Sequence, residues 1–299
     1  MTPCGVLYVD KPSGMTSHDV VNRIRKLYDT RQVGHTGTLD PMASGVLTLL
    51  VGRAVKASEY LSADSKGYEA KFILGKRTDT GDSTGKVTFK TDDVPSENEV
   101  IEVSRRFEGD IMQTPPMYSA LKVGGKKLVD LARKGIEVER TPRLVRVDRL
   151  EVSRLENGEY SMIAEVSKGT YIRTLITDIG DALGCGACMT YLRRTRCGNA
   201  WLDLAHTPDE IGQMSEEERI SLLRPVESAF TDCKEIVLPA FFEKLARDGN
   251  EIYLSKIGAP ELPLGSLVRL CGERGFFALG EVREYECGNA VKPVKQFDI

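Results

Sequence analysis

The amino-acid sequence predicts an α+β fold, in which hairpin-paired strands and helices pack together. Residues 145–155 and 160–166 read as two strands around Asn157-Gly158, a dipeptide typical of tight hairpins. Residues 171–183 instead carry apolar side chains at helical spacing and stop before Gly184, a frequent helix terminator. The length of 299 residues suits one large domain with a small appended one.

The N-terminal part begins with a short apolar run, residues 5–10 (GVLYVD), which predicts a strand and is followed by a Lys-Pro-Ser-Gly turn. Ser17 is the expected N-cap of a helix that runs through Lys26. A loop rich in glycine and threonine, residues 31–45, then precedes an apolar stretch over residues 46–51. Loops between buried elements often carry function.

The middle of the chain shows a second hairpin. Residues 68–74 read as a strand, residues 76–85 as a hairpin loop and residues 86–90 as the returning strand. Ser96 and Glu99 have the spacing of a capping box, which predicts a helix directly after them.

The C-terminal part has a different character. An acidic stretch, residues 209–218, marks a candidate boundary, and short apolar runs broken by glycine and proline follow it. We expect two domains, residues 1–229 and a small β-rich module at residues 230–299.

Composition points to a cytoplasmic protein. No apolar run approaches the ~20 residues that span a bilayer, and the N-terminus lacks the basic start and apolar core of a secretory signal. Seven cysteines at irregular spacing argue against a disulfide framework and for a reducing compartment. We expect a monomer that has no membrane partner.

The net charge of -3 hides an uneven distribution. Lys and Arg exceed Asp and Glu over residues 1–200, whereas residues 201–229 are strongly acidic. A local basic surface can bind a polyanion whatever the net charge, but charge alone also fits a solvated surface of mixed sign.

The candidate for chemistry is Asp40, in the loop segment GHTGTLDPMASG at residues 34–45. Glycines let a ligand approach the backbone closely, and Pro41 biases Asp40 toward an extended conformation. Such a carboxylate can act as a nucleophile or a general base. The same residues also fit an Asx-type turn with a structural aspartate.

Arg173 is the candidate partner for this carboxylate, because a guanidinium can bind a carboxylate with two hydrogen bonds. It lies near the start of an otherwise apolar helix, where the helix dipole does not favour a cation. A surface arginine remains the alternative.

Aromatic and basic side chains gather in two further segments, a pattern that single-stranded or flipped RNA requires and that two solvated faces also explain. These residues are Tyr118, Lys122, Lys126, Lys127, Arg133 and Lys134 in the first segment, and Tyr191, Arg193, Arg194 and Arg196 in the second.

The sequence predicts neither a metal nor an organic cofactor. Cys185 and Cys188 have zinc-ligand spacing, but no second pair follows. Residues 79–85 lack the carboxylate pattern of a calcium loop, and no GxxxxGK[ST] phosphate loop occurs.

Together these segments resemble bacterial TruB-type tRNA pseudouridine synthases. The resemblance spans residues 5–229 and consists of six blocks in family order: KPSGMTS at 11–17, GHTGTLDPMASG at 34–45, GKRTD at 75–79, MYSALKVGGKK at 117–127, SKGTYIRT at 167–174 and YLRRT at 191–195. It implies a central, mostly antiparallel sheet flanked by helices, and a PUA-like RNA-binding module at the C-terminus.

The resemblance also implies the reaction, isomerisation of the T-loop uridine-55 of transfer RNA to pseudouridine without a metal or other cofactor. Asp40 matches the family's essential aspartate, Tyr68 a tyrosine that lies against the base and helps to remove the C5 proton, and Arg173 the arginine that pairs with the aspartate. Whether Asp40 attacks the sugar or the base does not follow from the sequence.

Four further residues match substrate-binding positions. His35 corresponds to a histidine that helps to hold the flipped nucleotide, Tyr171 and Leu192 to residues of the uracil pocket, and Lys11 to a supporting position. Val129 stands where the family commonly has an aromatic residue, which puts a stacking role there in doubt.

Two other functions fit the same scaffold. The first is a non-catalytic protein that binds or folds RNA, against which the matched Asp40, Tyr68 and Arg173 argue. The second is a synthase of a guide-RNA complex, whose terminal extensions we do not find in this sequence.

Overall fold

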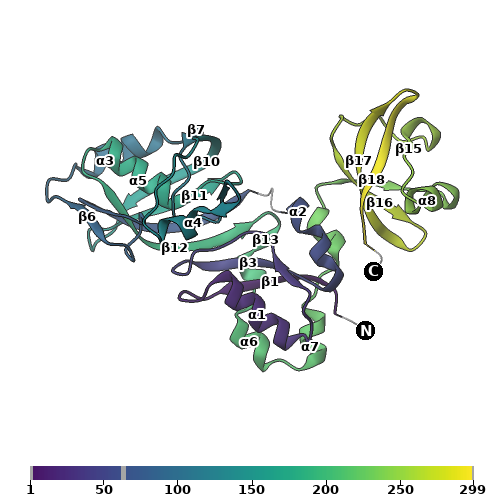
Figure 1. Cartoon of the computed structure of the whole chain (residues 1–299), viewed down its shortest axis with the longest axis horizontal. Helices are drawn as coiled ribbons and strands as arrows, with labels where there is room; N and C mark the ends of the chain where they lie inside the picture. The colour runs from purple at the N-terminus through teal and green to yellow at the C-terminus, as the bar shows by residue number, and fades with distance from the viewer. Residues whose placement is uncertain (1–2, 62–64, 298–299) are drawn as a thin grey trace.

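Two β-sheets organise the chain (Figure 1). The computed structural model describes residues 3–61 and 65–297. The larger sheet has nine strands and the C-terminal sheet has five, with two short two-stranded hairpins beside them. Within the described ranges, no helix is long and apolar enough to cross a membrane.

The nine-stranded sheet is mostly antiparallel, as predicted. Its main path runs β1-β3-β12-β4-β11-β10-β7, with β2 paired to β3 and β13 to β12. Only the contact between β3 and β12 is parallel among these pairs. The strands are β1 (Gly5–Lys11), β2 (Val33–His35), β3 (Ser44–Val51), β4 (Lys66–Leu74), β7 (Gly109–Gln113), β10 (Arg143–Arg154), β11 (Tyr160–Val166), β12 (Ala187–Cys197) and β13 (Ala200–Trp201).

Helices bury apolar faces against this sheet. Val20 and Ile24 of α1 and Leu175 and Ile179 of α5 are fully buried in one core with the strands. Burial of such side chains is the main stabilising contribution to the fold. The helices of this part are α1 (Ser17–Leu27), α2 (Ser58–Leu61), α3 (Glu97–Arg105), α4 (Leu128–Ala132), α5 (Ile172–Ala182), α6 (Pro208–Gln213) and α7 (Glu216–Ser221).

Several predicted elements are confirmed. The Asn157-Gly158 hairpin joins β10 to β11, and Ser96 and Glu99 form the capping box of α3. Gly184 follows α5 with a φ of 76°, a conformation that glycine adopts without steric cost. The second predicted hairpin is wrong in its pairing. The strand β6 (Val87–Lys90) pairs with β5 (Lys76–Thr78), which lies inside the segment expected as a loop, whereas residues 68–74 belong to β4 and pair with β11 and β12.

The predicted N-cap of α1 is wrong by one residue. Thr16 caps the helix, since its hydroxyl accepts a hydrogen bond from the Asp19 amide while the Asp19 carboxylate accepts one from the Thr16 amide. Ser17 is the first helical residue and is buried. Two adjacent hydroxyl residues made the choice ambiguous, and Asp19 decides it because it completes the capping box.

The acidic stretch is not a linker. It forms α6 and α7, whose Glu210 and Glu218 complete capping boxes with Thr207 and Ser215. Asp209 forms an ion pair with Arg23 of α1. These acidic residues therefore sit at helix N-termini, where the helix dipole favours them.

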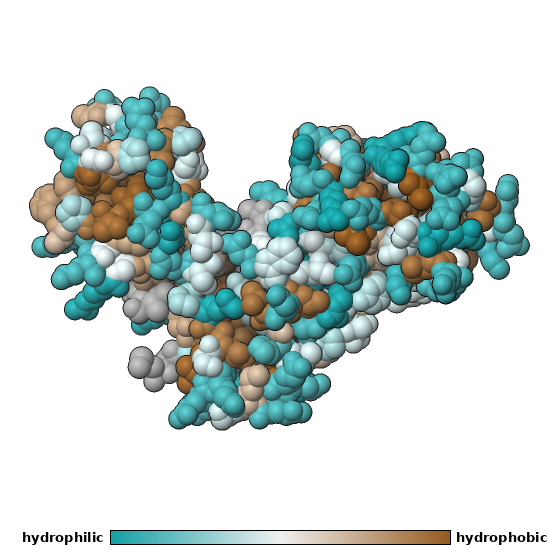
Figure 2. All heavy atoms as spheres, turned by 180° about the vertical axis from the view of Figure 1, so that it is seen from behind, coloured by the Kyte–Doolittle hydropathy of each residue, from teal (hydrophilic) through white to brown (hydrophobic). Residues whose placement is uncertain are grey.

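The predicted β-rich C-terminal module forms the five-stranded sheet, in the order β14-β16-β17-β18-β15. Its elements are β14 (Lys234–Val237), α8 (Ala240–Arg247), β15 (Ile252–Tyr253), β16 (Leu267–Gly272), β17 (Gly275–Tyr285) and β18 (Gly288–Gln296). Seen from behind, a notch separates this lobe from the rest of the mostly hydrophilic surface (Figure 2). We propose that the two domains divide near Phe230, whose ring packs against Phe276 and Phe297. All seven cysteines are free.

Candidate active site

A cavity of about 470 Å³ opens beside the centre of the large sheet. It brings together five of the seven predicted site residues: Asp40, Tyr68, Tyr171, Arg173 and Leu192. Its walls come from the loop at residues 36–40, from β4, from residues 118–121, from residues 169–173 at the start of α5, and from β12.

The loop that carries Asp40 is fixed by the first family block. The Ser17 hydroxyl accepts a hydrogen bond from the Leu39 amide (2.9 Å) and lies 3.1 Å from the Leu39 carbonyl oxygen, to which it donates. The Lys11 ammonium and the Gly14 amide both donate to the Pro41 carbonyl. Residues 11–17 thus hold the backbone on both sides of Asp40.

Gly45 ends the loop and permits close packing of β3 against β12. Its φ is 105°, and a Cβ there would lie 2.2 Å from the carbonyl oxygen of Arg194. Any residue with a side chain would displace a strand here, so the position requires glycine.

Arg173 binds Asp40 through one hydrogen bond, from Nη2, and a second close ion-pair contact, from Nε. Nε lies 2.9 Å from Asp40 Oδ2, and Nη2 lies 3.1 Å from Oδ1. The Arg173 side chain is only 6% exposed, whereas the Asp40 side chain keeps 34% exposure. The guanidinium is therefore buried, whereas the carboxylate that it holds remains accessible from the cavity.

The remaining donors of Arg173 fix its position. Nη1 donates to the Thr80 carbonyl (2.9 Å) and Nη2 to the Tyr118 carbonyl (2.8 Å). The Asp82 carboxylate lies 3.8 Å from Nη1 and is buried. Three elements distant in sequence thus orient one guanidinium.

Sequence reasoning missed Asp82. We considered its segment only as a hairpin loop and a failed calcium motif. The signal lay in the neighbouring hydroxyls, because Thr80 and Thr84 donate to the Asp82 carboxylate. A carboxylate surrounded by threonines can be buried, since its oxygens find donors within its own loop.

The electrostatics of Asp40 balance two opposing effects. Burial raises the pKa of the Asp40 carboxyl above its ordinary value, and the charge of Asp82 acts in the same direction. The Arg173 and Lys11 cations oppose this rise in pKa. A carboxylate with a raised pKa is more basic and a better nucleophile than an ordinary aspartate, provided that it is ionised.

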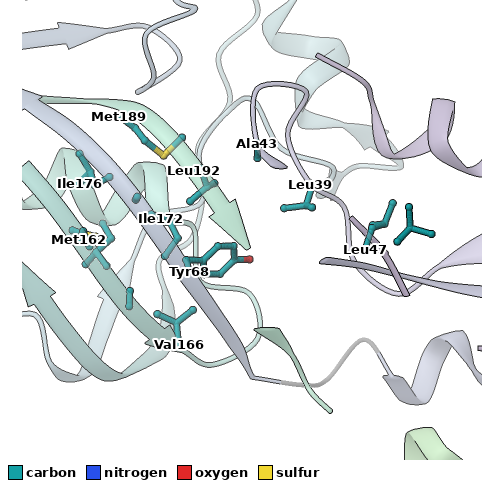
Figure 3. Close-up of a cluster of buried hydrophobic side chains, with 14 of the residues drawn as sticks. Leu39, Ala43, Leu47, Tyr68, Met162, Val166, Ile172, Ile176, Met189 and Leu192 are labelled. Atoms are coloured by element: carbon teal, nitrogen blue, oxygen red, sulfur yellow. The ribbon is translucent and has the colours of Figure 1, made fainter. Parts of the chain in front are cut away.

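Tyr68 projects from β4 into the same cavity, beside Ile172 and Leu192 (Figure 3). Its hydroxyl points toward the loop that carries Leu39 (Figure 3). Arg194 pairs with Tyr68 in the β4–β12 register and also lines the cavity. Burial raises the pKa of Tyr68, while Arg194 opposes this rise.

Tyr171 forms the N-cap of α5 and lines the cavity. Buried Gln113 holds its backbone from both sides, because the Gln113 side chain accepts from the Tyr171 amide (2.7 Å) and donates to its carbonyl (3.2 Å). These two hydrogen bonds from the Gln113 side chain fix the start of α5, two residues before Arg173. Burial raises the pKa of the Tyr171 phenol.

Lys11 and His35 are not among the residues that line the cavity within the described ranges. The Lys11 ammonium is fully buried and donates to the carbonyls of Pro12, Met15 and Pro41. Burial lowers the pKa of Lys11 to about 8 and also lowers the pKa of His35. The geometry gives Lys11 a role in holding the Asp40 loop, and substrate contact by either residue stays a prediction.

The two basic segments differ. Arg193 pairs with Asp10 (2.7 Å), Arg196 pairs with Glu165 (3.0 Å), and Arg194 is 1% exposed. These three arginines therefore hold the sheet together. The sequence alone suggests only RNA binding or a solvated surface for this segment. The first segment instead forms the short hairpin of β8 (Lys122–Val123) and β9 (Lys126–Lys127), whose lysines are exposed beside the cavity wall.

Comparison with known proteins agrees with this geometry. Residues 25–172 match the family model described as TruB family pseudouridylate synthase (N terminal domain), and residues 173–231 match that of the tRNA pseudouridylate synthase B C-terminal domain. The tRNA pseudouridine synthase B of Alkaliphilus oremlandii is 40% identical over 280 residues, which cover 93% of each chain. That of Methylobacillus flagellatus is 39% identical and covers 93% of this chain and 90% of its own.

Solved structures support the same assignment. A Cbf5-Nop10-Gar1 complex contains a chain that superposes with a TM-score of 0.76 at 29% identity and covers 99% of this chain and 85% of its own. A chain of an H/ACA RNP bound to a substrate RNA superposes with a TM-score of 0.74 at 27% identity and covers 100% of this chain and 86% of its own. Because family models, full-length relatives and fold agree, the chain belongs to the TruB family of tRNA pseudouridine synthases, which are isomerases.

Proposed function

We propose that this enzyme isomerises uridine-55 in the T-loop of transfer RNA, with Asp40 as the nucleophile. The observation that carries this proposal is the paired Asp40 and Arg173 at the base of an accessible cavity. The curated relatives named tRNA pseudouridine synthase B support the choice of transfer RNA.

The size of the cavity supports base flipping. A volume of about 470 Å³ suits one nucleotide and excludes a base that remains stacked in RNA. Tyr171, Leu192 and Tyr68 supply the apolar and aromatic walls against which a pyrimidine ring can pack. His35 remains a proposed contact of the flipped nucleotide.

The chemistry requires one bond exchange and one proton exchange. The N1–C1′ bond breaks, a C5–C1′ bond forms, C5 loses a proton and N1 gains one. In our proposal Asp40 becomes covalently linked to the nucleotide while the base turns, and then leaves again. Arg173 keeps the carboxylate oriented and ionised despite its burial.

In the last step the C5–H bond breaks and its electron pair forms the C5=C6 double bond. We assign the acceptor of that proton to the phenolate form of Tyr68, which then passes the proton to solvent. Tyr68 lines the same cavity as Asp40, which supports this assignment.

Binding of the RNA outside the cavity falls to the hairpin lysines. Lys122, Lys126 and Lys127 are exposed next to Tyr118, which lines the cavity. Their charges can neutralise backbone phosphates and release counterions. We further infer that the enzyme acts in the cytoplasm, where free buried cysteines such as Cys185 and Cys188 stay reduced.

The test is incubation of the enzyme with a T-arm hairpin labelled at the target uridine, followed by nucleoside analysis. We expect pseudouridine at that position, and none at a uridine moved two positions along the loop. A protein that only binds or folds RNA would retain the hairpin and leave the uridine unchanged.

A further inference from the structure

Arg194 is the largest fully buried side chain of the chain's described part. It lies in β12 and is 1% exposed. In the ranges that the structure covers, no ion pair joins it to a carboxylate. A buried cation without a counter-ion is costly, so its position calls for a reason beyond packing.

Its contacts join three parts of the active site. Nε donates to the Val46 carbonyl (2.7 Å) and Nη2 donates to the Gly37 carbonyl in the Asp40 loop (3.2 Å). The guanidinium also lies close enough to Tyr68 to oppose the rise in the pKa of its phenol. The strand register explains why these groups lie close together, because Arg194 pairs with Gly45 of β3 on one side and with Tyr68 of β4 on the other.

We propose that Arg194 is a positioning residue, which holds the Tyr68 oxygen over the flipped base and stabilises negative charge on that oxygen. The proposal deepens the proposed function and rests on it. Arg194 itself contacts Tyr68 and two backbone carbonyls, and acts on the uridine only through Tyr68.

The charges around Tyr68 agree with this role. Burial, Cys197 and Asp40 all raise the pKa of the phenol, and Arg194 is the group that lowers it. Without Arg194, burial, Cys197 and Asp40 would all disfavour the phenolate form of Tyr68. The Arg194 charge therefore favours the phenolate, the form of Tyr68 that can accept the C5 proton.

Direct contact with an RNA phosphate fits the geometry less well. A phosphate ligand needs accessible donors, whereas the Arg194 guanidinium lies beneath the Asp40 loop and uses its donors on buried carbonyls. The neighbouring Arg196 serves as a matched control. It lies in the same strand, is ion-paired with Glu165, and is not a lining residue of the cavity.

The experiment compares wild type, Arg194→Lys, Tyr68→Phe, the double variant and Arg196→Lys in single turnovers on the T-arm hairpin. We expect Arg194→Lys to lower the maximal single-turnover rate about 10²-fold, as for loss of a positioned proton acceptor. The RNA concentration that gives half the maximal rate should stay within about twofold of the wild-type value. In the Tyr68→Phe background the same change should cost less than about threefold. Arg196→Lys should stay within about threefold of wild type.

A second readout uses a hairpin with deuterium at C5 of the target uridine. Slower removal of that proton should give Arg194→Lys a larger isotope effect on product formation than wild type shows. If Arg194→Lys does not fold, Arg194→Gln replaces it, because removing an unpaired buried charge is often tolerated.

The outcomes separate the two proposals. Two results would overturn the assignment of Arg194. The first is an isotope effect in Arg194→Lys equal to that of wild type. The second is a loss of rate on Arg194→Lys substitution that is as large in the Tyr68→Phe background as in wild type. Wild-type enzyme that forms no pseudouridine contradicts the proposed function itself.

Discussion

The Arg173 guanidinium and the Asp40 carboxylate meet through an ion-pair contact of 2.9 Å and a hydrogen bond of 3.1 Å, across 133 positions of sequence. The pair combines a buried cation with a partly exposed anion. This asymmetry lets the arginine stay fixed while the carboxylate reacts. The carbonyls of Thr80 and Tyr118 take up other donors of the guanidinium, so it keeps its orientation when Asp40 changes charge.

Arg173→Ala should impair turnover far more than RNA binding. The substitution removes the ion pair and the hydrogen bond to Asp40 and leaves the exposed lysines intact, so we expect kcat to fall about 10²–10³-fold. The dissociation constant of the T-arm hairpin, measured by filter binding, should change by less than about threefold. Equal losses in both quantities would identify Arg173 as a phosphate contact instead.

Ser17→Ala should slow catalysis without direct contact with the substrate. It removes two hydrogen bonds to Leu39, each contributing about 1 kcal/mol, and loosens the backbone before Asp40. We expect kcat to fall about 3–10-fold with KM nearly unchanged. Ser13→Ala is the control, since its single hydrogen bond to Met42 is solvent-exposed. Wild-type turnover in Ser17→Ala would show that this contact does not position the loop.

RNA binding should depend strongly on salt, and the hairpin lysines should carry part of that dependence. Each phosphate contact contributes about 0.7–0.9 to the slope of log K against log salt concentration. Replacing Lys122, Lys126 and Lys127 with alanine should lower the slope by about two to three, as measured by titration at several salt concentrations. Lys26→Ala, on α1, provides the control. A triple variant with the wild-type slope would place the phosphate contacts elsewhere.

Stability should fall as pH rises through the titration of Asp178. Burial, reinforced by Asp181, raises the pKa of Asp178 from 3.8 to about 6, so the folded state binds more protons than the unfolded state between these values. The folded protein therefore loses stability from about pH 4 to pH 6 and remains less stable above that range. Asp178→Asn should raise Tm by about 2–4 °C at pH 7.5 and leave it unchanged at pH 4. An equal change in Tm at both pH values would exclude titration as the cause.

Local signals in the sequence predicted much of the fold. The Asn157-Gly158 turn, the Ser96 capping box and the Gly184 helix end each depend on neighbouring residues, and all three appear in the structure. The antiparallel character of the large sheet came from resemblance to a family, and the order of its strands was not predicted, because pairing between distant strands leaves no local pattern.

The site was predicted less completely. The five residues that line the cavity followed from the family motifs, whereas the burial of Arg194 and Asp82 did not. An arginine among other basic residues reads as a surface residue, and only the β3-β12-β4 register places it beneath Asp40. Lys11 was likewise expected to support substrate binding, but its ammonium donates hydrogen bonds to three backbone carbonyls of its own chain.

In the proposed reaction, the Asp40 carboxylate performs the chemistry. The most direct measurement compares pseudouridine formation and RNA binding for wild type and Asp40→Asn on the same labelled T-arm hairpin. We predict that Asp40→Asn binds the hairpin within about threefold of wild type and forms no detectable pseudouridine, since the amide cannot act as a nucleophile. Formation of pseudouridine by Asp40→Asn at the wild-type rate would contradict the account.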